Sequence, residues 1–166
     1  IATSTDSMLA ERYRVMEAQN PEAYRQAIAN VIIAKALMKK AGCYKKAGSN
    51  GAVAGQGGIG GIGVENWILQ SGGSLYDAMK SFVDVSDQAI AASASDRYRA
   101  FKLFKVNYPI FDMGQNFQSR RYREQEYPYD DLTEGDRTSA GRFEIGGWEK
   151  MLEVCRETIS KYEAES

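Results

Sequence analysis

The segment between Gly48 and Gly63 constrains the fold of this chain more than any other feature. It holds eight of the 16 glycines, and its bulky apolar side chains are Val53, Ile59 and Ile62. Glycine has no Cβ and loses more conformational freedom on folding than any other residue, so the segment cannot form a stable helix or a central strand. The sequence therefore predicts a glycine-rich loop that leads into a short helix.

Helical patterns lie on both sides of this loop. Asn20-Pro21 is a helix start, and apolar residues then recur at helical spacing until Gly42 ends the pattern. Further helices are predicted over about 5–18, over Val64–Gln70, from Ser74, from Ser95 or Asp96, and after Gly147. We therefore predict a mostly α fold of about five or six helices, forming one domain over 1–166, with a long irregular segment near 107–142.

Composition excludes several kinds of catalytic site. The chain has no histidine, so Ser-His-Asp triads, Cys-His pairs and HExxH zinc sites are all excluded. The net charge of −1 argues against a generally basic nucleic-acid binder, and any such contact must use local patches. Cys43 and Cys155 lack CxxC spacing; they suggest reduced thiols, although the sequence also allows one disulfide.

The ends of the chain and its apolar runs bear on its location. No apolar run reaches the roughly 18 residues that span a bilayer, and no charged segment leads into an apolar one at Ile1. We therefore expect a cytoplasmic protein without a membrane partner. Because the chain begins with Ile1 and not with methionine, we also expect a fragment of a longer protein.

The glycine segment matches GxGxxG twice, at Gly55–Gly60 and at Gly58–Gly63. Backbone amides at a helix N-terminus bind phosphate, because the unpaired N–H groups and the helix dipole point the same way. A dinucleotide-binding fold also needs an apolar strand just before the motif, and residues 48–54 do not provide one. A Rossmann fold is therefore disfavoured. Two interpretations stay open: an anion site, or close packing of the following helix against a neighbour.

A basic cluster precedes the glycine segment. It contains Lys35, Lys39, Lys40, Lys45 and Lys46, with Tyr44 among them. Lys35 and Lys39 are one helical turn apart and so share a face. Beside glycine amides such a cluster suits a polyphosphate, while a solvated amphipathic face gives the same pattern. The sequence leaves both interpretations open.

A further motif combines Gly73-Ser74 with Asp84 and Asp87. The head of polymerase-β-like nucleotidyltransferases carries Gly-Ser and, about ten residues later, two carboxylates that hold Mg²⁺ ions. Here Ser86 stands where the second carboxylate is required, and the flanking pattern is helical. We therefore interpret Asp84 and Asp87 as solvated helix charges, and we predict no catalytic residue and no metal site in this chain.

The residues around the glycine segment resemble one family. Ile33–Tyr44, the glycine run and Gly61–Leu75 look like the helical domain of archaeal-type CCA-adding tRNA nucleotidyltransferases. Related substrate-binding helical domains occur in poly(A) polymerases and oligoadenylate synthases. The shared pattern is a Lys followed nine positions later by Tyr after a Gly, a Gly-rich turn, a helix with a central Glu, and Gly-Ser. It covers about residues 25–83.

The resemblance implies a domain that positions nucleotide and acceptor. In the family the matching Lys and Tyr contact the triphosphate of the incoming nucleotide. With the glycine amides added, the predicted nucleotide-binding residues are Lys35, Tyr44, Gly57, Gly58, Gly60, Gly61, Gly73 and Ser74. The family's catalytic carboxylates lie in an upstream domain, which becomes an expected partner. This fragment needs no cofactor of its own, whereas a full-length enzyme would use Mg²⁺ and NTP, with RNA as a candidate acceptor.

A second hypothesis stands beside this one. The chain would be a helical protein-interaction module, in which the glycine run only packs helices and the Tyr- and Arg-rich segment Tyr108–Tyr129 binds protein. A catalytic domain upstream in the full gene favours the first hypothesis, and its absence favours the second.

Overall fold

The computed structural model describes residues 4–45, 59–108 and 145–165. These residues form six helices and one pair of short parallel strands, which confirms the predicted mostly α fold. The helices are α1 (Ser4–Gln19), α2 (Pro21–Ala41), α3 (Gly61–Gln70), α4 (Leu75–Ala92), α5 (Arg97–Asn107) and α7 (Ile145–Glu165). The strands are β1 (Tyr44–Lys45) and β2 (Ile59–Gly60). Most of the segment predicted to be irregular, 107–142, lies outside the described residues.

Polar side chains cap three helices where the sequence predicts it. Asn20 caps α2, Ser74 caps α4 and Asp96 caps α5, each accepting a hydrogen bond from a backbone N–H of the first turn. Gly42 ends α2 in the left-handed conformation with a φ of +80°, and its N–H bonds to the carbonyl of Lys39. These local signals explain why the helix order follows the sequence pattern so closely.

Two helices begin earlier than predicted. Helix α3 begins at Gly61 and not at Val64, and α7 begins at Ile145 and so includes the two glycines that follow it. Glycine in a helix costs up to about 1 kcal/mol relative to alanine. Burial of the apolar faces of both helices offsets that cost, because tertiary packing supplies most helix stability in a folded protein.

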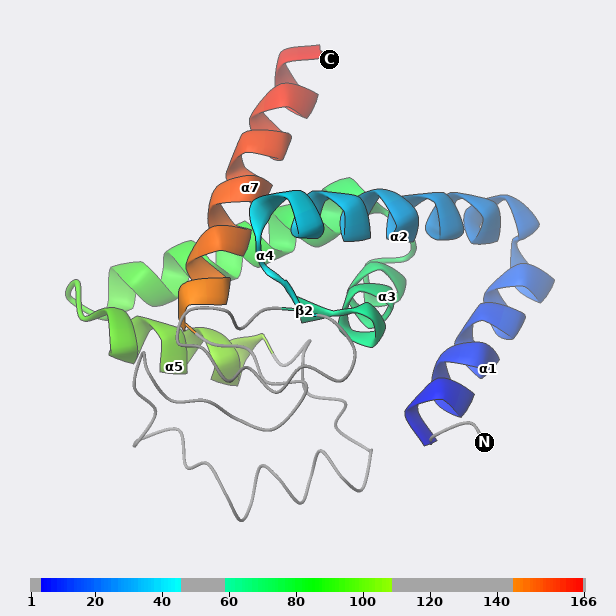
Figure 1. The fold of residues 1–166 in the computed structure, drawn as a ribbon, viewed down its shortest axis with the longest axis horizontal. Coiled ribbons are helices and arrows are strands. Elements are labelled where there is room, and N and C mark those ends of the chain that lie inside the picture. Colours follow the sequence, from blue (N-terminus) through cyan, green and yellow to red (C-terminus); the bar gives the residue numbers. More distant parts are fainter. Residues whose placement is uncertain (1–3, 46–58, 109–144, 166) are drawn as a thin grey trace.

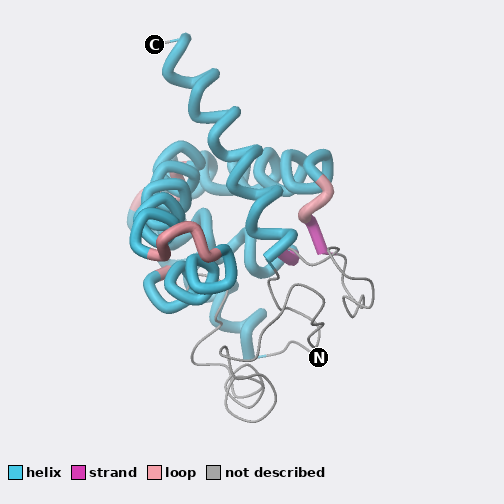
Figure 2. The backbone as a smooth tube through the Cα atoms, turned by 90° about the vertical axis from the view of Figure 1, so that its left-hand side faces the viewer, coloured by secondary structure: helices cyan, strands magenta, loops and turns pink. Residues whose placement is uncertain are grey.

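The helices pack around α2 and α4. In Figure 1, α2 runs horizontally across the upper part of the molecule, α3 lies beneath it, and α1 turns away from its N-terminal end. Helix α5 packs along α4, while α7 contacts both α4 and α2. The end of α7 extends away from the packed helices, as Figure 1 and the rotated view of Figure 2 both show.

An aromatic cluster fills the core between α3, α4, α5 and α7. Phe82 meets Phe104 edge to face, with ring centroids 5.1 Å apart, and Phe104 stacks on Trp148 at 5.5 Å. From α3, Trp67 contacts Phe82 at 6.1 Å. Burying one such ring contributes on the order of 1.5–3 kcal/mol relative to leaving it exposed. This cluster anchors α3, whose first turn carries the candidate site described below.

Both cysteines are buried free thiols. The Sγ of Cys43 lies 3.4 Å from the Sδ of Met38 in a mostly apolar environment. Burial raises the pKa of Cys43 from its ordinary value of 9.0 to about 11, although the nearby Lys150 ammonium opposes the shift. Burial also raises the pKa of Cys155, and the neighbouring Cys43 adds to that effect.

We expect the buried Cys43 thiol to make stability depend on pH. The pKa of this thiol is higher in the folded than in the unfolded state. Its contribution to the free energy of unfolding is therefore complete below pH 9 and is lost as the pH rises towards 11. Urea unfolding at several pH values should therefore show the free energy of unfolding falling over this window. The fall should be smaller in Cys43→Ala, and identical slopes in the two proteins would contradict the assignment.

Candidate phosphate site at the start of helix α3

Two local structures bring the start of α3 beside the end of α2. The chain reverses at Gly42, where the N–H of Cys43 bonds to the carbonyl of Met38 at 3.0 Å. Strand β1 then pairs in parallel with β2, which places Tyr44 opposite Ile59. Since α3 begins directly after β2, this pairing sets Tyr44 beside the first turn of α3.

Lys35 and Tyr44 both reach Gly61, the first residue of α3. A Cβ built on Gly61 would lie 3.0 Å from the Oη of Tyr44 and 3.7 Å from the Nζ of Lys35. The ammonium and the phenol therefore converge on the helix start at a point where a side chain on residue 61 would be crowded. The sequence predicts all three as site residues, and the structure brings them together.

Lys39 adds a second ammonium to this group. Its Nζ lies 5.0 Å from the centroid of the Tyr44 ring, within the range of a cation–π contact. Sequence reasoning placed Lys39 in the basic cluster but not among the nucleotide contacts. Its spacing of one turn from Lys35 was the available signal, because it puts both side chains on the flank of α2 that turns towards Tyr44.

The first turn of α3 has no side-chain cap. Gly60 occupies the N-cap position, and no acidic residue lies in the first turn of the helix. The N–H groups of that turn and the helix dipole therefore act in the same direction as the charges of Lys35 and Lys39. The result is a pair of lysine side chains beside directed N–H donors, which suits an anion such as phosphate.

Contacts further along the helix hold α3 in this orientation, including one at Glu65, which lies one turn after Gly61 on the same face. The indole N–H of Trp67 donates to the Oη of Tyr108 at 3.0 Å. On the side of α1, the Oη of Tyr13 donates to the carboxylate of Glu65 at 3.0 Å, and burial together with Glu65 raises the pKa of Tyr13. Glu65, the central Glu of the family-like pattern, is thus bound to α1.

Gly73 and Ser74 lie in the turn between α3 and α4, away from Lys35. A Cβ on Gly73 would lie 3.0 Å from the Cβ of Ala27, and the Gly73 carbonyl accepts a hydrogen bond from the side chain of Asn30 at 2.7 Å. Ala27 and Lys35 are eight residues apart on α2, about 12 Å along the helix axis. The structure therefore does not bring Gly73 and Ser74 to the start of α3, and it shows them in packing and capping contacts.

Two predicted glycines and one lysine of the basic cluster are not part of the group at Gly61. Gly57 and Gly58 lie outside the described residues. Lys40 lies on the opposite flank of α2 from Lys35 and lines a groove of about 270 Å³ between α2 and α7. The charged residues of this groove are Lys40, Lys150, Lys161, Glu153 and Glu157. Because the groove mixes both signs of charge, it favours anions less than the start of α3 does.

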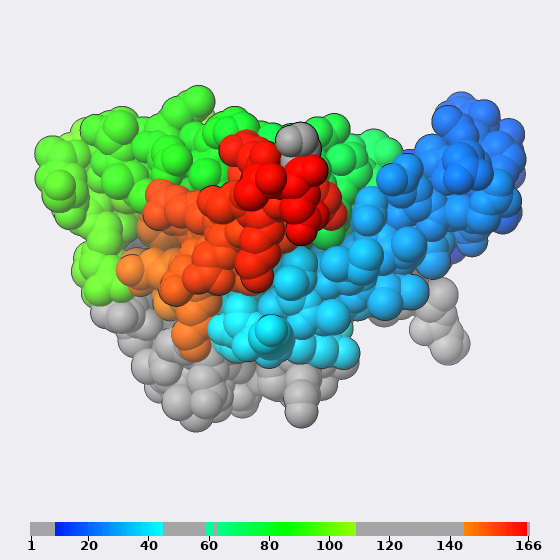
Figure 3. All heavy atoms as spheres, turned by 90° about the horizontal axis from the view of Figure 1, so that it is seen from above, coloured from blue at the N-terminus to red at the C-terminus, as the bar shows by residue number. Residues whose placement is uncertain are grey.

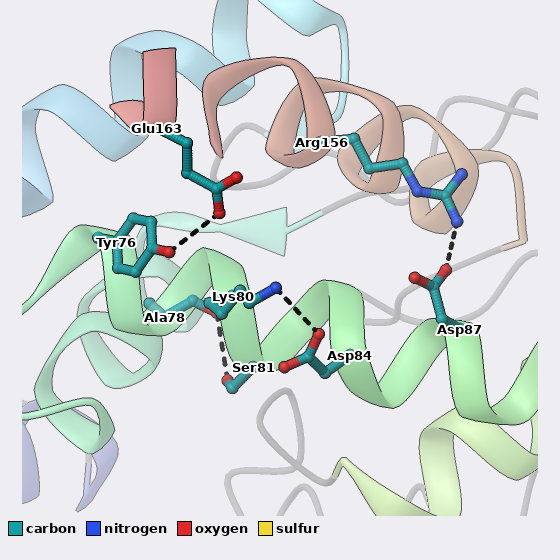
Figure 4. A network of polar contacts seen from close by, with 8 residues as sticks. All are labelled: Tyr76, Ala78, Lys80, Ser81, Asp84, Asp87, Arg156 and Glu163. Carbon is teal, nitrogen blue, oxygen red and sulfur yellow. Dashed lines mark hydrogen bonds and ion pairs between the residues drawn. The ribbon is translucent and has the colours of Figure 1, made fainter. Parts of the chain in front are cut away.

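Asp84 and Asp87 both take part in ion pairs on the surface of α4. The carboxylate of Asp84 lies 3.6 Å from the Nζ of Lys80, one turn earlier on the same helix. Asp87 pairs with Arg156 of α7, so the two aspartates point to different partners (Figure 4). All four side chains are about half exposed, which agrees with the interpretation of these aspartates as solvated helix charges.

Ser86, between these two aspartates, belongs to the core. It is fully buried and accepts a hydrogen bond from the indole N–H of Trp148 at 3.0 Å. A buried indole N–H needs an acceptor of this kind. Ser86 stands where a nucleotidyltransferase head requires its second carboxylate. In this chain its hydroxyl instead joins α4 to α7 through the hydrogen bond from Trp148.

The described residues were also compared with the patterns of metal sites and membrane spans, and the whole chain with known proteins. Within residues 4–45, 59–108 and 145–165, no three Cys, Asp or Glu side chains are grouped so as to hold a metal ion. The helices of this part of the chain include none with the length and hydropathy needed to cross a bilayer. No protein-family model matches the chain, and the searches of curated proteins and of solved structures gave no match.

We expect Ser86→Ala to lower the free energy of unfolding by about 1–3 kcal/mol, because it leaves the buried N–H of Trp148 without an acceptor. Urea unfolding followed by tryptophan fluorescence measures the loss. Ser160→Ala on the exposed side of α7 is the matched control and should change stability by less than about 0.5 kcal/mol. Equal effects in the two variants would refute the role given to Ser86.

Proposed function

We propose that this domain positions a nucleotide by binding its phosphates at the start of α3. The observation that carries the proposal is the convergence of Lys35 and Tyr44 on Gly61. A lysine ammonium supplies a mobile point charge, and the first turn of α3 supplies N–H donors of fixed direction. Together they suit a polyphosphate, whose several oxygens can take both kinds of contact.

The proposed enzyme is a polymerase-β-superfamily nucleotidyltransferase of the cytoplasm, of which this chain forms the helical domain. The resemblance of residues 25–83 to that family supports the proposal. An upstream catalytic domain would supply the carboxylates and Mg²⁺, and RNA is the proposed acceptor. Holding a triphosphate in line with its acceptor supplies much of the rate in phosphoryl transfer, so the domain contributes to catalysis through binding alone.

The rival function, a helical protein-interaction module, draws support from Gly73. That glycine packs against Ala27 and takes no part in the group at Gly61. If Gly61 likewise serves only close packing, it lets Tyr44 approach the start of α3, and this part of the helix binds no anion. The two hypotheses therefore differ in one measurable property, the affinity of the first turn of α3 for phosphate.

We expect pyrophosphate to shift the backbone amide signals of Gly60–Gly63 in an NMR titration, with a dissociation constant around millimolar. Lys35→Ala removes one charge-assisted contact and should weaken binding by about five- to tenfold. Lys40→Ala is the matched control, since Lys40 lies on the same helix but lines the groove with α7. If these amides do not move, or if both variants weaken binding equally, the site is absent and the packing role remains.

Gly61→Ala should separate binding from stability. Alanine favours a helix over glycine by roughly 0.5–1 kcal/mol, and the shift that the new Cβ imposes on Tyr44 opposes this gain, so thermal stability should change little. The new Cβ, however, would lie 3.0 Å from the Oη of Tyr44 and would fill the space between the two polar groups. Pyrophosphate affinity should fall at least threefold, and unchanged affinity would show that the space at Gly61 has no role in binding.

A further inference from the structure

Helix α1 lies outside the core that the other described helices share. The contiguous cluster of buried side chains draws on α2, α3, α4, α5 and α7, and none of residues 9–19 of α1 belongs to it. Of those residues, Leu9 alone is buried. In Figure 1 and in the view from above in Figure 3, α1 lies at one end of the molecule, where it contacts α2 and α3. Burial of apolar surface therefore holds this part of α1 more weakly than it holds the other helices.

Two polar contacts join α1 to α3. The Oη of Tyr13 donates to the carboxylate of Glu65 at 3.0 Å, and the guanidinium of Arg12 donates to the side-chain oxygen of Asn66. Asn66 is only 4% exposed, and the group that α1 brings to it is polar. Polar groups can exchange a protein partner for water when two helices separate, so separation here costs less than at an apolar contact. Interfaces between parts of a protein that move relative to each other are polar in the same way.

The corner between α1 and α2 consists of one residue, Asn20. Its N–H bonds back to the carbonyl of Met16 in α1, and its side chain caps α2, so both helices stay regular up to this point. Asn20 itself is not helical, with a φ of −154° and a ψ of 89°, and a change at these two angles would move α1 as a unit. Across the corner, the rings of Tyr13 and Tyr24 meet edge to face with centroids 6.2 Å apart. Tyr13 therefore holds α1 against both α2 and α3.

The remaining helices keep their shared core when α1 separates, because α2 packs on α3, α4 and α7. We propose that α1 is a hinged arm, which Tyr13 holds in the docked position and which opens at Asn20 while the other helices stay folded. Opening frees Glu65 and uncovers Asn66, on the part of α3 that follows its first turn at Gly61. A helix of 16 residues detached from its neighbours is only marginally stable in water, so opening also exposes the N–H groups of α1 to exchange. The arm opens whether or not phosphate binds at Gly61.

The first test is native-state hydrogen exchange, followed for each amide by NMR. Amides in the middle of α1 should exchange at least about 100-fold faster than the slowest amides of α4, because they need only local opening. Tyr13→Ala removes the ring contact and the hydrogen bond to Glu65, so it should speed exchange in α1 by a further factor of about ten and leave α4 unchanged. Arg14→Ala is the matched control, since Arg14 is exposed and pairs with Glu11 of its own helix; it should alter exchange in α1 by no more than about twofold. If α1 exchanges as slowly as α4, or if Tyr13→Ala speeds both helices equally, the proposal fails.

The second test uses the two native thiols as internal references. Cys43 and Cys155 are buried in the shared core, so a thiol reagent should reach them only when that core opens. Leu9→Cys places a third thiol at the buried position of α1. Mass spectrometry should show position 9 labelled at least about 100-fold faster than positions 43 and 155, and about tenfold faster again when Tyr13→Ala is added. Labelling at position 9 that is as slow as at the two core thiols, or that Tyr13→Ala leaves unchanged, would overturn the proposal.

Discussion

The pairing of β1 with β2 is the contact on which the candidate site depends. Each strand has only two residues, so their own hydrogen bonds contribute little to stability. Burial holds them in place: Cys43 and Ile59 are each only 1% exposed, and the N–H of Ile59 bonds to the carbonyl of Cys43 at 2.9 Å. The core therefore fixes the position of Tyr44 through two buried neighbours, and the phenol reaches the start of α3 as a consequence.

Two glycines of the same family-like pattern have different physical reasons to be glycine. At Gly73 the φ of +86° and the contact with Ala27 both disfavour a side chain, so backbone conformation and packing together explain the residue. At Gly61 the backbone is helical, and the groups that would crowd a side chain are the polar ends of Lys35 and Tyr44. The crowding at Gly61 therefore comes from polar side chains, whereas the crowding at Gly73 comes from the backbone and Cβ atoms of α2.

The helices could be predicted because their signals are local. Asn20, Ser74 and Asp96 cap the helices they precede, and Gly42 ends α2, all through contacts within a few residues. The strands could not be predicted, since two residues have no measurable periodicity. The meeting of Lys35, Tyr44 and Gly61 depends on those strands, so only the resemblance linked these residues before the structure did. The resemblance also grouped Gly73 and Ser74 with them, which the structure places elsewhere.

Helix α2 makes three kinds of contact: its buried face packs in the core, Asn30 bonds to Gly73, and Lys35 reaches Gly61. Between Ala27 and Met38 its only polar residues are Asn30 and Lys35. Asn30 donates to the carbonyl of Gly73 and so fastens the turn before α4, while Lys35 reaches the start of α3. Every other side chain in this stretch is apolar, including those on the outer face. On the outer face, Ile32 and Ile33 are 64% and 46% exposed, so these two side chains add less to the stability of the domain than the buried Val31 and Met38 do.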